Sequence, residues 1–153
     1  MPTTHAVHKA GQAVAACEFG IKFDRVMLLW DDQSGTDLKV VDWLHRPATN
    51  CRQVRSRHEK LLTTLLAGSA AMLVLLGKSL KRDDDVKIAK RYIETWLTWL
   101  EEPSVCIIIK QRGRAARLMQ RKKCTVLRVA TELDSRGMLT ARQVRALCER
   151  GEN

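Results

Sequence analysis

The residues with the clearest chemical role form one run of positive charge, KQRGRAARLMQRKK, at residues 110–123. Seven of its fourteen side chains are Lys or Arg, and no Asp or Glu occurs between Glu102 and Glu132. Ammonium and guanidinium groups bind phosphate oxygens, and arginine does so through a forked pair of hydrogen bonds. The run therefore suggests a site for an anionic ligand, such as a nucleic-acid backbone.

On a helix, with about 100° per residue, five basic side chains of this region fall within a stripe about 60° wide. The stripe is formed by Lys110, Arg114, Arg117, Arg121 and Arg128. Apolar residues occupy the opposite arc, so one side is expected to pack while the other presents a line of charge about 27 Å long. No acidic residue stands one helical turn away from its first four members, Lys110 to Arg121, to neutralise them. Phosphates along a strand form a comparable line of charge.

A second basic group, at the start of a long helix expected from Cys51, adds Arg52 and Arg55 to the predicted binding residues. The chain has 27 Lys and Arg against 17 Asp and Glu, a net charge of +10. A charge of this sign and size favours anionic partners. Contact with an RNA or DNA backbone is the preferred interpretation, and an acidic protein partner or a solvated helix face are the alternatives.

Two modes of base recognition have less support. The segment LTARQVRALCERG resembles the first part of a helix-turn-helix, but no recognition helix follows it, so specific duplex reading is not expected. Single-strand binding through stacking needs exposed aromatic side chains. Trp96 and Trp99 share a helix side with Tyr92, so we expect both tryptophans to pack in the core.

Residues typical of catalysis or metal binding do not form a recognisable set. His5 and His8 stand one helical turn apart, with no nearby residue to complete a metal site. No phosphate-binding glycine loop, GxSxG or HExxH is present. We therefore expect a protein without enzymatic activity, cofactor or metal. The five cysteines form no CxxC pair, which indicates a reducing, cytoplasmic location.

The elements that must position these residues are mostly helices. Helical patterns and capping residues predict helices at residues 3–19, 38–46, 51–78, 83–102, 113–133 and 140–150. Residues 21–30 and 104–112 are ambiguous between helix and strand. The expected fold is all-α: a single domain, residues 1–153, built as a compact bundle of about five to seven helices around a central apolar helix.

The central helix is expected at the uncharged segment Leu61–Gly77, with Leu65–Leu76 at the middle of the bundle. Its 17 uncharged residues span about 26 Å as a helix, slightly short of a hydrocarbon core of about 30 Å. A helix that is apolar on nearly all sides is typical of one surrounded by other helices. We therefore prefer a buried helix to a membrane span and expect no membrane partner.

This small, basic, nearly all-helical chain resembles the small subunits of multi-subunit CRISPR–Cas effector complexes. The features that match are the basic helix around Arg114, Arg117 and Arg121, the basic start of the long helix at Arg52 and Arg55, and the apolar bundle core. The resemblance lies in architecture and charge layout over the whole chain.

The resemblance implies a helical bundle stacked in several copies along a guide-RNA filament, with a role in antiviral defence. Its basic face would support the guide–target duplex or the displaced strand without reading sequence. Expected partners are thus nucleic acid and other protein subunits, copies of this chain among them. The alternatives are a DNA-binding regulator of a mobile element or plasmid and an adaptor that docks an acidic protein.

Overall fold

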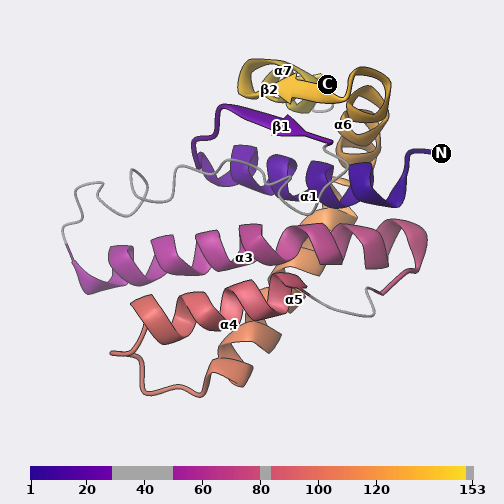
Figure 1. Ribbon diagram of the computed structural model, residues 1–153. Coiled ribbons are helices and arrows are strands. Elements are labelled where there is room, and N and C mark those ends of the chain that lie inside the picture. The colour runs from indigo at the N-terminus through magenta and orange to yellow at the C-terminus, as the bar shows by residue number, and fades with distance from the viewer. Residues whose placement is uncertain (29–49, 80–83, 151–153) are drawn as a thin grey trace.

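The computed structural model describes residues 1–28, 50–79 and 84–150, and 77% of this part of the chain is helical. Within it lie six helices and one two-stranded sheet (Figure 1). The elements are α1 (Thr4–Phe19), β1 (Arg25–Met27), α3 (Cys51–Leu76), α4 (Asp84–Trp96), α5 (Ser104–Arg121), α6 (Lys123–Arg136), β2 (Met138–Thr140) and α7 (Ala141–Glu149). The predicted all-α bundle is confirmed. The helix expected at residues 38–46 lies outside the described residues.

Helix α3 is the central helix of the bundle, with α1 on one side and α4 and α5 on the other (Figure 1). The Asn50 side chain caps its start by accepting a hydrogen bond from the Gln53 amide at 2.9 Å, and Gly77 ends it in the left-handed conformation. All of residues 61–72 except Leu65 are buried. The buried centre thus lies closer to the helix start than predicted, because residues 73–76 are exposed or half-buried.

Among the described helices, α3 alone has the length and apolar composition needed to cross a membrane. Half of its most apolar window is buried inside the protein. The neighbouring helices therefore cover much of the apolar surface that a bilayer would otherwise cover.

Small residues and one buried polar cluster hold α1 tightly against α3. A Cβ atom at Gly11 would lie 2.6 Å from the Ala71 Cβ, so this position requires glycine, and one at Gly68 would lie 2.5 Å from Nε2 of His8 and would displace the imidazole. His8 Nε2 also lies 2.9 Å from the buried carboxylate of Asp85, at the start of α4. These contacts hold the first half of α1 against α3 and the start of α4.

The described part of the ambiguous segment 21–30 contains the short strand β1 and no helix. β1 pairs with β2 in antiparallel register, with Val26 opposite Leu139. Directly after β2, Thr140 and Gln143 form a reciprocal capping box that starts α7, as the sequence predicted for Thr140.

The prediction of one helix over residues 113–133 is wrong, because the chain forms two helices there. Helix α5 begins at Ser104, passes without a break through Gly113 and ends at Arg121. Lys122 leaves the helical conformation and forms an ion pair with Glu18 at 3.1 Å. The turn at Lys122 brings the apolar side of α6 onto α1, where it is buried. The stability gained by burying that side of α6 outweighs the stability lost by interrupting one long helix.

The expected core packing of the two tryptophans is also wrong. Helix α4 ends at Trp96 instead of continuing to Glu102, and Trp96 and Trp99 are 53% and 51% exposed. The core-facing side of this region is formed instead by Ala89, Ile93 and Leu97. Both tryptophans consequently lie on the surface.

Candidate nucleic-acid interface

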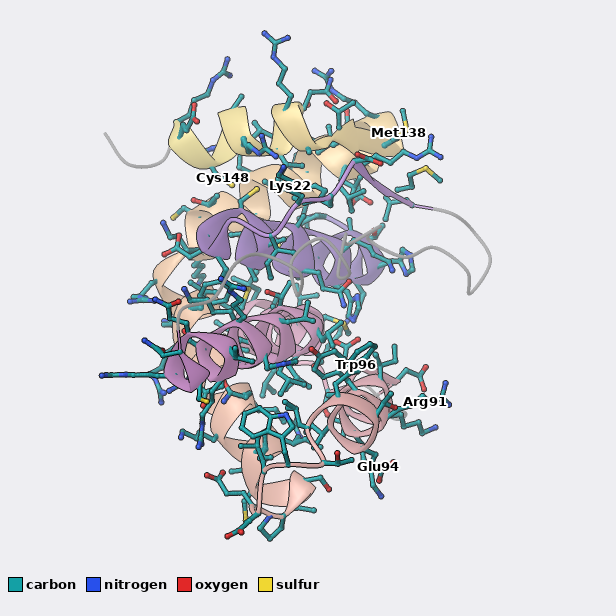
Figure 2. All side chains as sticks on the ribbon, turned by 90° about the vertical axis from the view of Figure 1, so that its left-hand side faces the viewer. Lys22, Arg91, Glu94, Trp96, Met138 and Cys148 are labelled. Carbon is teal, nitrogen blue, oxygen red and sulfur yellow. The ribbon has the colours of Figure 1, made fainter. Side chains whose placement is uncertain are left out.

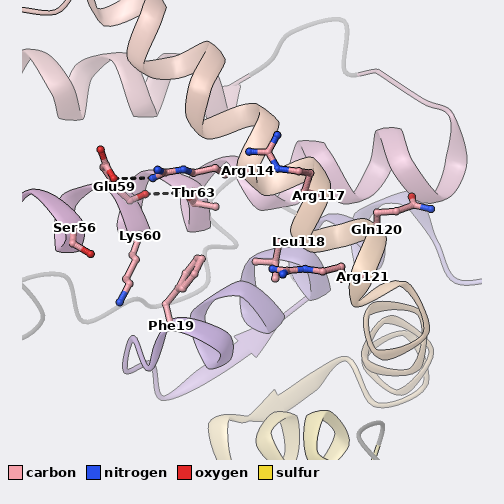
Figure 3. A pocket seen from close by; sticks show the side chains of 10 residues that line it. All are labelled: Phe19, Ser56, Glu59, Lys60, Thr63, Arg114, Arg117, Leu118, Gln120 and Arg121. Atoms are coloured by element: carbon pink, nitrogen blue, oxygen red, sulfur yellow. Dashed lines mark hydrogen bonds and ion pairs between the residues drawn. The ribbon is translucent and has the colours of Figure 1, made fainter.

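A groove of about 620 Å³ lies between the carboxyl end of α1, the first half of α3 and the second half of α5 (Figure 3). We call it the basic groove. The described residues that line it are Phe19, Ser56, Glu59, Lys60, Thr63, Arg114, Arg117, Leu118, Gln120 and Arg121. Four of these side chains are positive and one is negative, for a net charge of +3.

Helix α5 supplies three of the four cations because it buries one side and exposes the other. Ala115, Leu118 and Met119 are buried against the bundle. One turn apart on the other side, Arg114, Arg117 and Arg121 reach the groove. The local helical pattern that predicted this stripe is therefore correct from Arg114 to Arg121.

A buried hydrogen bond fixes the separation of α3 and α5 beside the groove. The Thr63 hydroxyl donates to Oε1 of Gln111 at 3.0 Å, and Gln111 is 1% exposed. Buried polar groups are costly without partners, so this pair favours one spacing of the two helices. These two helices of the groove are thus joined by a buried polar contact.

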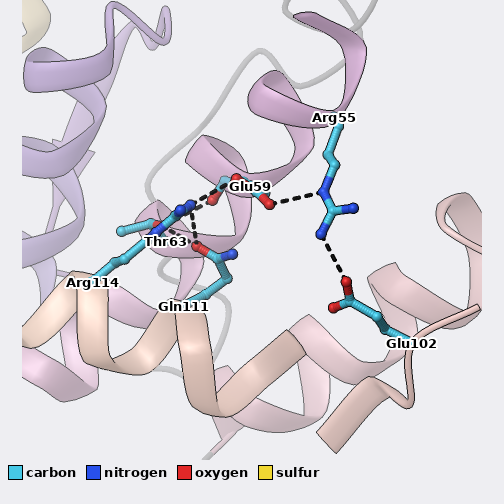
Figure 4. A network of polar contacts seen from close by, with 6 residues as sticks. All are labelled: Arg55, Glu59, Thr63, Glu102, Gln111 and Arg114. Carbon is cyan, nitrogen blue, oxygen red and sulfur yellow. Dashed lines mark hydrogen bonds and ion pairs between the residues drawn. The ribbon is translucent and has the colours of Figure 1, made fainter. Parts of the chain in front are cut away.

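Glu59, on α3, is the centre of a network of charged residues at one end of the groove (Figure 4). Its two carboxylate oxygens accept hydrogen bonds from Arg114 at 2.7 Å and from Arg55 at 3.1 Å. Arg55 also donates to Glu102 at 2.9 Å. Burial alone would raise the pKa of the Glu59 carboxyl, but the hydrogen bonds from Arg114 and Arg55 outweigh it and lower that pKa. Glu59 is therefore ionised at neutral pH.

This network gives two of the predicted binding residues a structural role. Arg114 lines the groove while bound to Glu59, and Arg55 joins α3 to the segment between α4 and α5. No acid on α5 neutralises the stripe, as expected, but Glu59 reaches Arg114 from another helix. Sequence spacing within one helix could not reveal such a partner.

Three other cations of the groove differ from Arg114. Lys60, Arg117 and Arg121 are exposed, and none of them forms an ion pair or side-chain hydrogen bond with a residue that the structure describes. They come from two helices and line the same concave surface. Within the described part of the chain, their charge is therefore not neutralised.

The remaining predicted residues lie outside the basic groove. Lys110 is exposed on α5, next to the Arg55–Glu59 pair, and Arg52 is exposed in the first turn of α3. Arg128 lies on α6, where it is half-buried and donates to the backbone carbonyl of Leu147 at 2.9 Å. The turn at Lys122 thus removes Arg128 from the line and shortens the predicted stripe.

Seven of the ten groove residues were absent from the predicted set, and the two with most bearing on a ligand are Lys60 and Phe19. Lys60 belongs to the basic first half of α3, but which side of that half faces α5 depends on how the helices pack. Phe19 is the last residue of α1, 95 residues before Arg114 in the sequence. The left-handed Gly20 after it marks the helix end, yet no local signal indicates that the ring faces a groove.

The described residues contain no group of three or more His, Cys, Asp or Glu side chains placed to hold a metal ion. No protein-family model matches this sequence, and no curated protein matches it. Function therefore has to be inferred from the chemistry of the basic groove.

Proposed function

We propose that this protein is a non-catalytic subunit of a ribonucleoprotein that binds a nucleic-acid backbone in the basic groove. The observation that carries the proposal is the convergence of Lys60, Arg117 and Arg121, which have no ion-pair partner among the described residues. Cations on a concave surface concentrate the electric field and attract anions. Guanidinium groups in addition bind phosphate oxygens in a forked geometry.

The Glu59 network supports this role by holding the groove in shape. Its two arginines compensate the carboxylate, so the acid does not cancel the charge of the other three cations. The cations of the groove suit phosphate oxygens, which are the same at every nucleotide, and this fits binding without sequence reading.

Membership of a complex is part of the same proposal. An all-α bundle with a basic groove fits a small subunit of a CRISPR–Cas effector complex, in which it would contact other protein subunits and guide or target strands. All five cysteines are free, which supports a cytoplasmic location.

The test is a charge reversal of the three available cations, Lys60→Glu, Arg117→Glu and Arg121→Glu. A matched control reverses Arg91, Arg142 and Arg150, exposed residues that do not line the groove. Each triple variant lowers the net charge by six, from +10 to +4. We expect the groove variant to lose about 100-fold or more in affinity for an oligonucleotide, and the control only a few-fold.

Salt dependence gives an independent measure. Three phosphate contacts on a single strand predict a slope of about −2 in log K against log salt, and the groove variant should lose that slope. Unchanged affinity in the groove variant would overturn the proposal. A larger loss in the control would point to the alternative of a DNA-binding regulator that uses α7. A wild-type protein that binds acidic polypeptides but no oligonucleotide would point to the adaptor.

A further inference from the structure

The basic groove contains an aromatic ring among its cations. Phe19 is half-buried and packs against the core while its ring also lines the groove. Figure 3 shows the ring between Lys60 on one side and Leu118 and Arg121 on the other. The groove therefore combines phosphate-binding groups with a flat apolar surface.

The position of the ring is fixed by the end of α1. Gly20 adopts the left-handed conformation with φ of 69°, and the Ile21 amide then donates to the Ala16 carbonyl at 2.8 Å. Ile21 is buried directly after this turn. The backbone on both sides of Phe19 is thus held in place, so little freedom remains to be lost when a ligand binds.

A phosphate backbone gains nothing from an apolar ring, whereas a base gains stacking energy from it. In a duplex the faces of the bases are covered by their neighbours, and only the base edges are accessible in the grooves. A ring set within a groove can therefore meet a base face only if the strand is unpaired.

We propose, on the basis of the function proposed above, that the basic groove binds single-stranded nucleic acid with one base stacked on Phe19. Lys60, Arg117 and Arg121 contact the phosphates on both sides of that nucleotide. The ring makes no distinction between the four bases, because every base has an aromatic face. Strand state, and not sequence, is what the groove recognises.

The first experiment compares an unpaired homopolymer strand with the same strand annealed to its complement. The wild-type protein should prefer the single strand about tenfold or more. Phe19→Leu should lower single-strand affinity by about 5- to 150-fold and leave duplex affinity unchanged. Phe19→Tyr should retain single-strand affinity, since it keeps the ring. Equal wild-type affinity for the two forms would overturn the inference.

A second experiment separates stacking from a purely structural role of Phe19. A strand with abasic sugars at every position keeps the phosphates but removes the bases. The wild-type protein should bind it as weakly as Phe19→Leu binds the normal strand, and Phe19→Leu should bind both strands alike. If Phe19→Leu weakens abasic binding as well, the ring only supports the fold and the inference is wrong.

The two proposals fail in different ways. If the triple charge reversal abolishes binding while Phe19→Leu changes nothing, the groove binds a backbone without stacking. If the charge reversal changes nothing, backbone binding in the groove fails, and with it the role of Phe19.

Discussion

Within the part of the chain that the structure describes, two regions with exposed aromatic rings differ in the charge around those rings. In the basic groove, Phe19 lies among four cations and one acid. At the second region, which we call the aromatic end, Trp96 and Trp99 lie in the segment ETWLTWLEEP, which has three glutamates and no Lys or Arg. The aromatic end presents more exposed ring surface, but its segment carries no cation of its own to bind phosphate. Charge, and not ring exposure, distinguishes the two regions as nucleic-acid sites.

The two regions belong to different elements, although Arg55 links them by binding both Glu59 and Glu102. Figure 2 shows Trp96, with Arg91 and Glu94, at the opposite end of the molecule from Met138 and Cys148. Trp99 contacts the ring of His58 edge-on, with ring centroids 6.4 Å apart, and its indole donates to the Trp96 carbonyl at 3.2 Å. A half-exposed pair of tryptophans with a rim of glutamates is better suited to a protein neighbour than to an anionic strand.

The largest expected effect is the difference in single-strand affinity between a variant of the basic groove and a variant of the aromatic end. Replacing Trp96 and Trp99 together by alanine should change single-strand affinity by less than about threefold, because no phosphate-binding residue is removed. The triple charge reversal in the groove should reduce it by about 100-fold in the same assay, fluorescence anisotropy with a labelled strand. Circular dichroism of both variants serves as the folding control. A Trp96/Trp99 variant that loses as much affinity as the groove variant would place the nucleic-acid site at the aromatic end.

An intermediate effect is expected at Glu59, which holds Arg114 of the groove in an ion pair. Glu59→Gln raises the net charge of the groove lining from +3 to +4. Affinity for a single strand should therefore rise by about 3- to 5-fold. The same change weakens the bonds to Arg55 and Arg114, so the melting temperature should fall by about 2–4 °C at neutral pH. Stability and binding should thus change in opposite directions.

The pH dependence of this variant has a defined sign. The folded-state pKa of Glu59 is lowered, so its stabilising contribution is present above the ordinary carboxyl pKa and is lost as the pH falls through the folded-state pKa. The difference in melting temperature between the wild type and Glu59→Gln should therefore shrink in acid. Glu94→Gln, at the aromatic end, removes only an exposed contact to Lys90 at 3.9 Å and is the matched control. A difference that widens in acid would contradict the proposed ion pairs.

Helix boundaries that depend on local chemistry could be predicted from the sequence. Thr3, Asn50 and Thr140 each accept a hydrogen bond from a backbone amide three residues on, and Gly20 and Gly77 end helices in the left-handed conformation. Each of these signals lies within a few residues of the boundary that it marks. The helical stripe from Arg114 to Arg121 depends on the same short-range periodicity and was also predictable.

Features that depend on distant contacts could not be predicted in this way. The turn at Lys122 follows from the burial of α6 against α1, and no Gly or Pro marks it. The exposure of Trp96 and Trp99 follows from the early end of α4, seven residues before Pro103. The groove is formed by residues of three helices. The sequence pattern of a single helix therefore could not predict the Glu59–Arg114 bond or the position of Phe19.

The smallest expected effect concerns Gly113, which lies in the part of α5 that lines the groove. Its backbone is helical, and glycine within a helix costs about 1 kcal/mol relative to alanine. A Cβ atom there would lie 3.6 Å from Nη1 of Arg117, an ordinary contact that leaves the guanidinium in place. Gly113→Ala should therefore raise the melting temperature by about 2–4 °C and change single-strand affinity by less than about twofold.

Gly11→Ala is the matched control for that prediction, because its Cβ would meet Ala71 at 2.6 Å and the Ala67 carbonyl oxygen at 2.7 Å. Helices α1 and α3 would have to separate, at a cost of about 1–3 kcal/mol, and Phe19 would move with α1. Gly11→Ala should thus lower both the melting temperature and single-strand affinity, although it lies outside the groove. A loss of affinity in Gly113→Ala without a loss of stability would instead show that the space beside Arg117 is itself part of the binding surface.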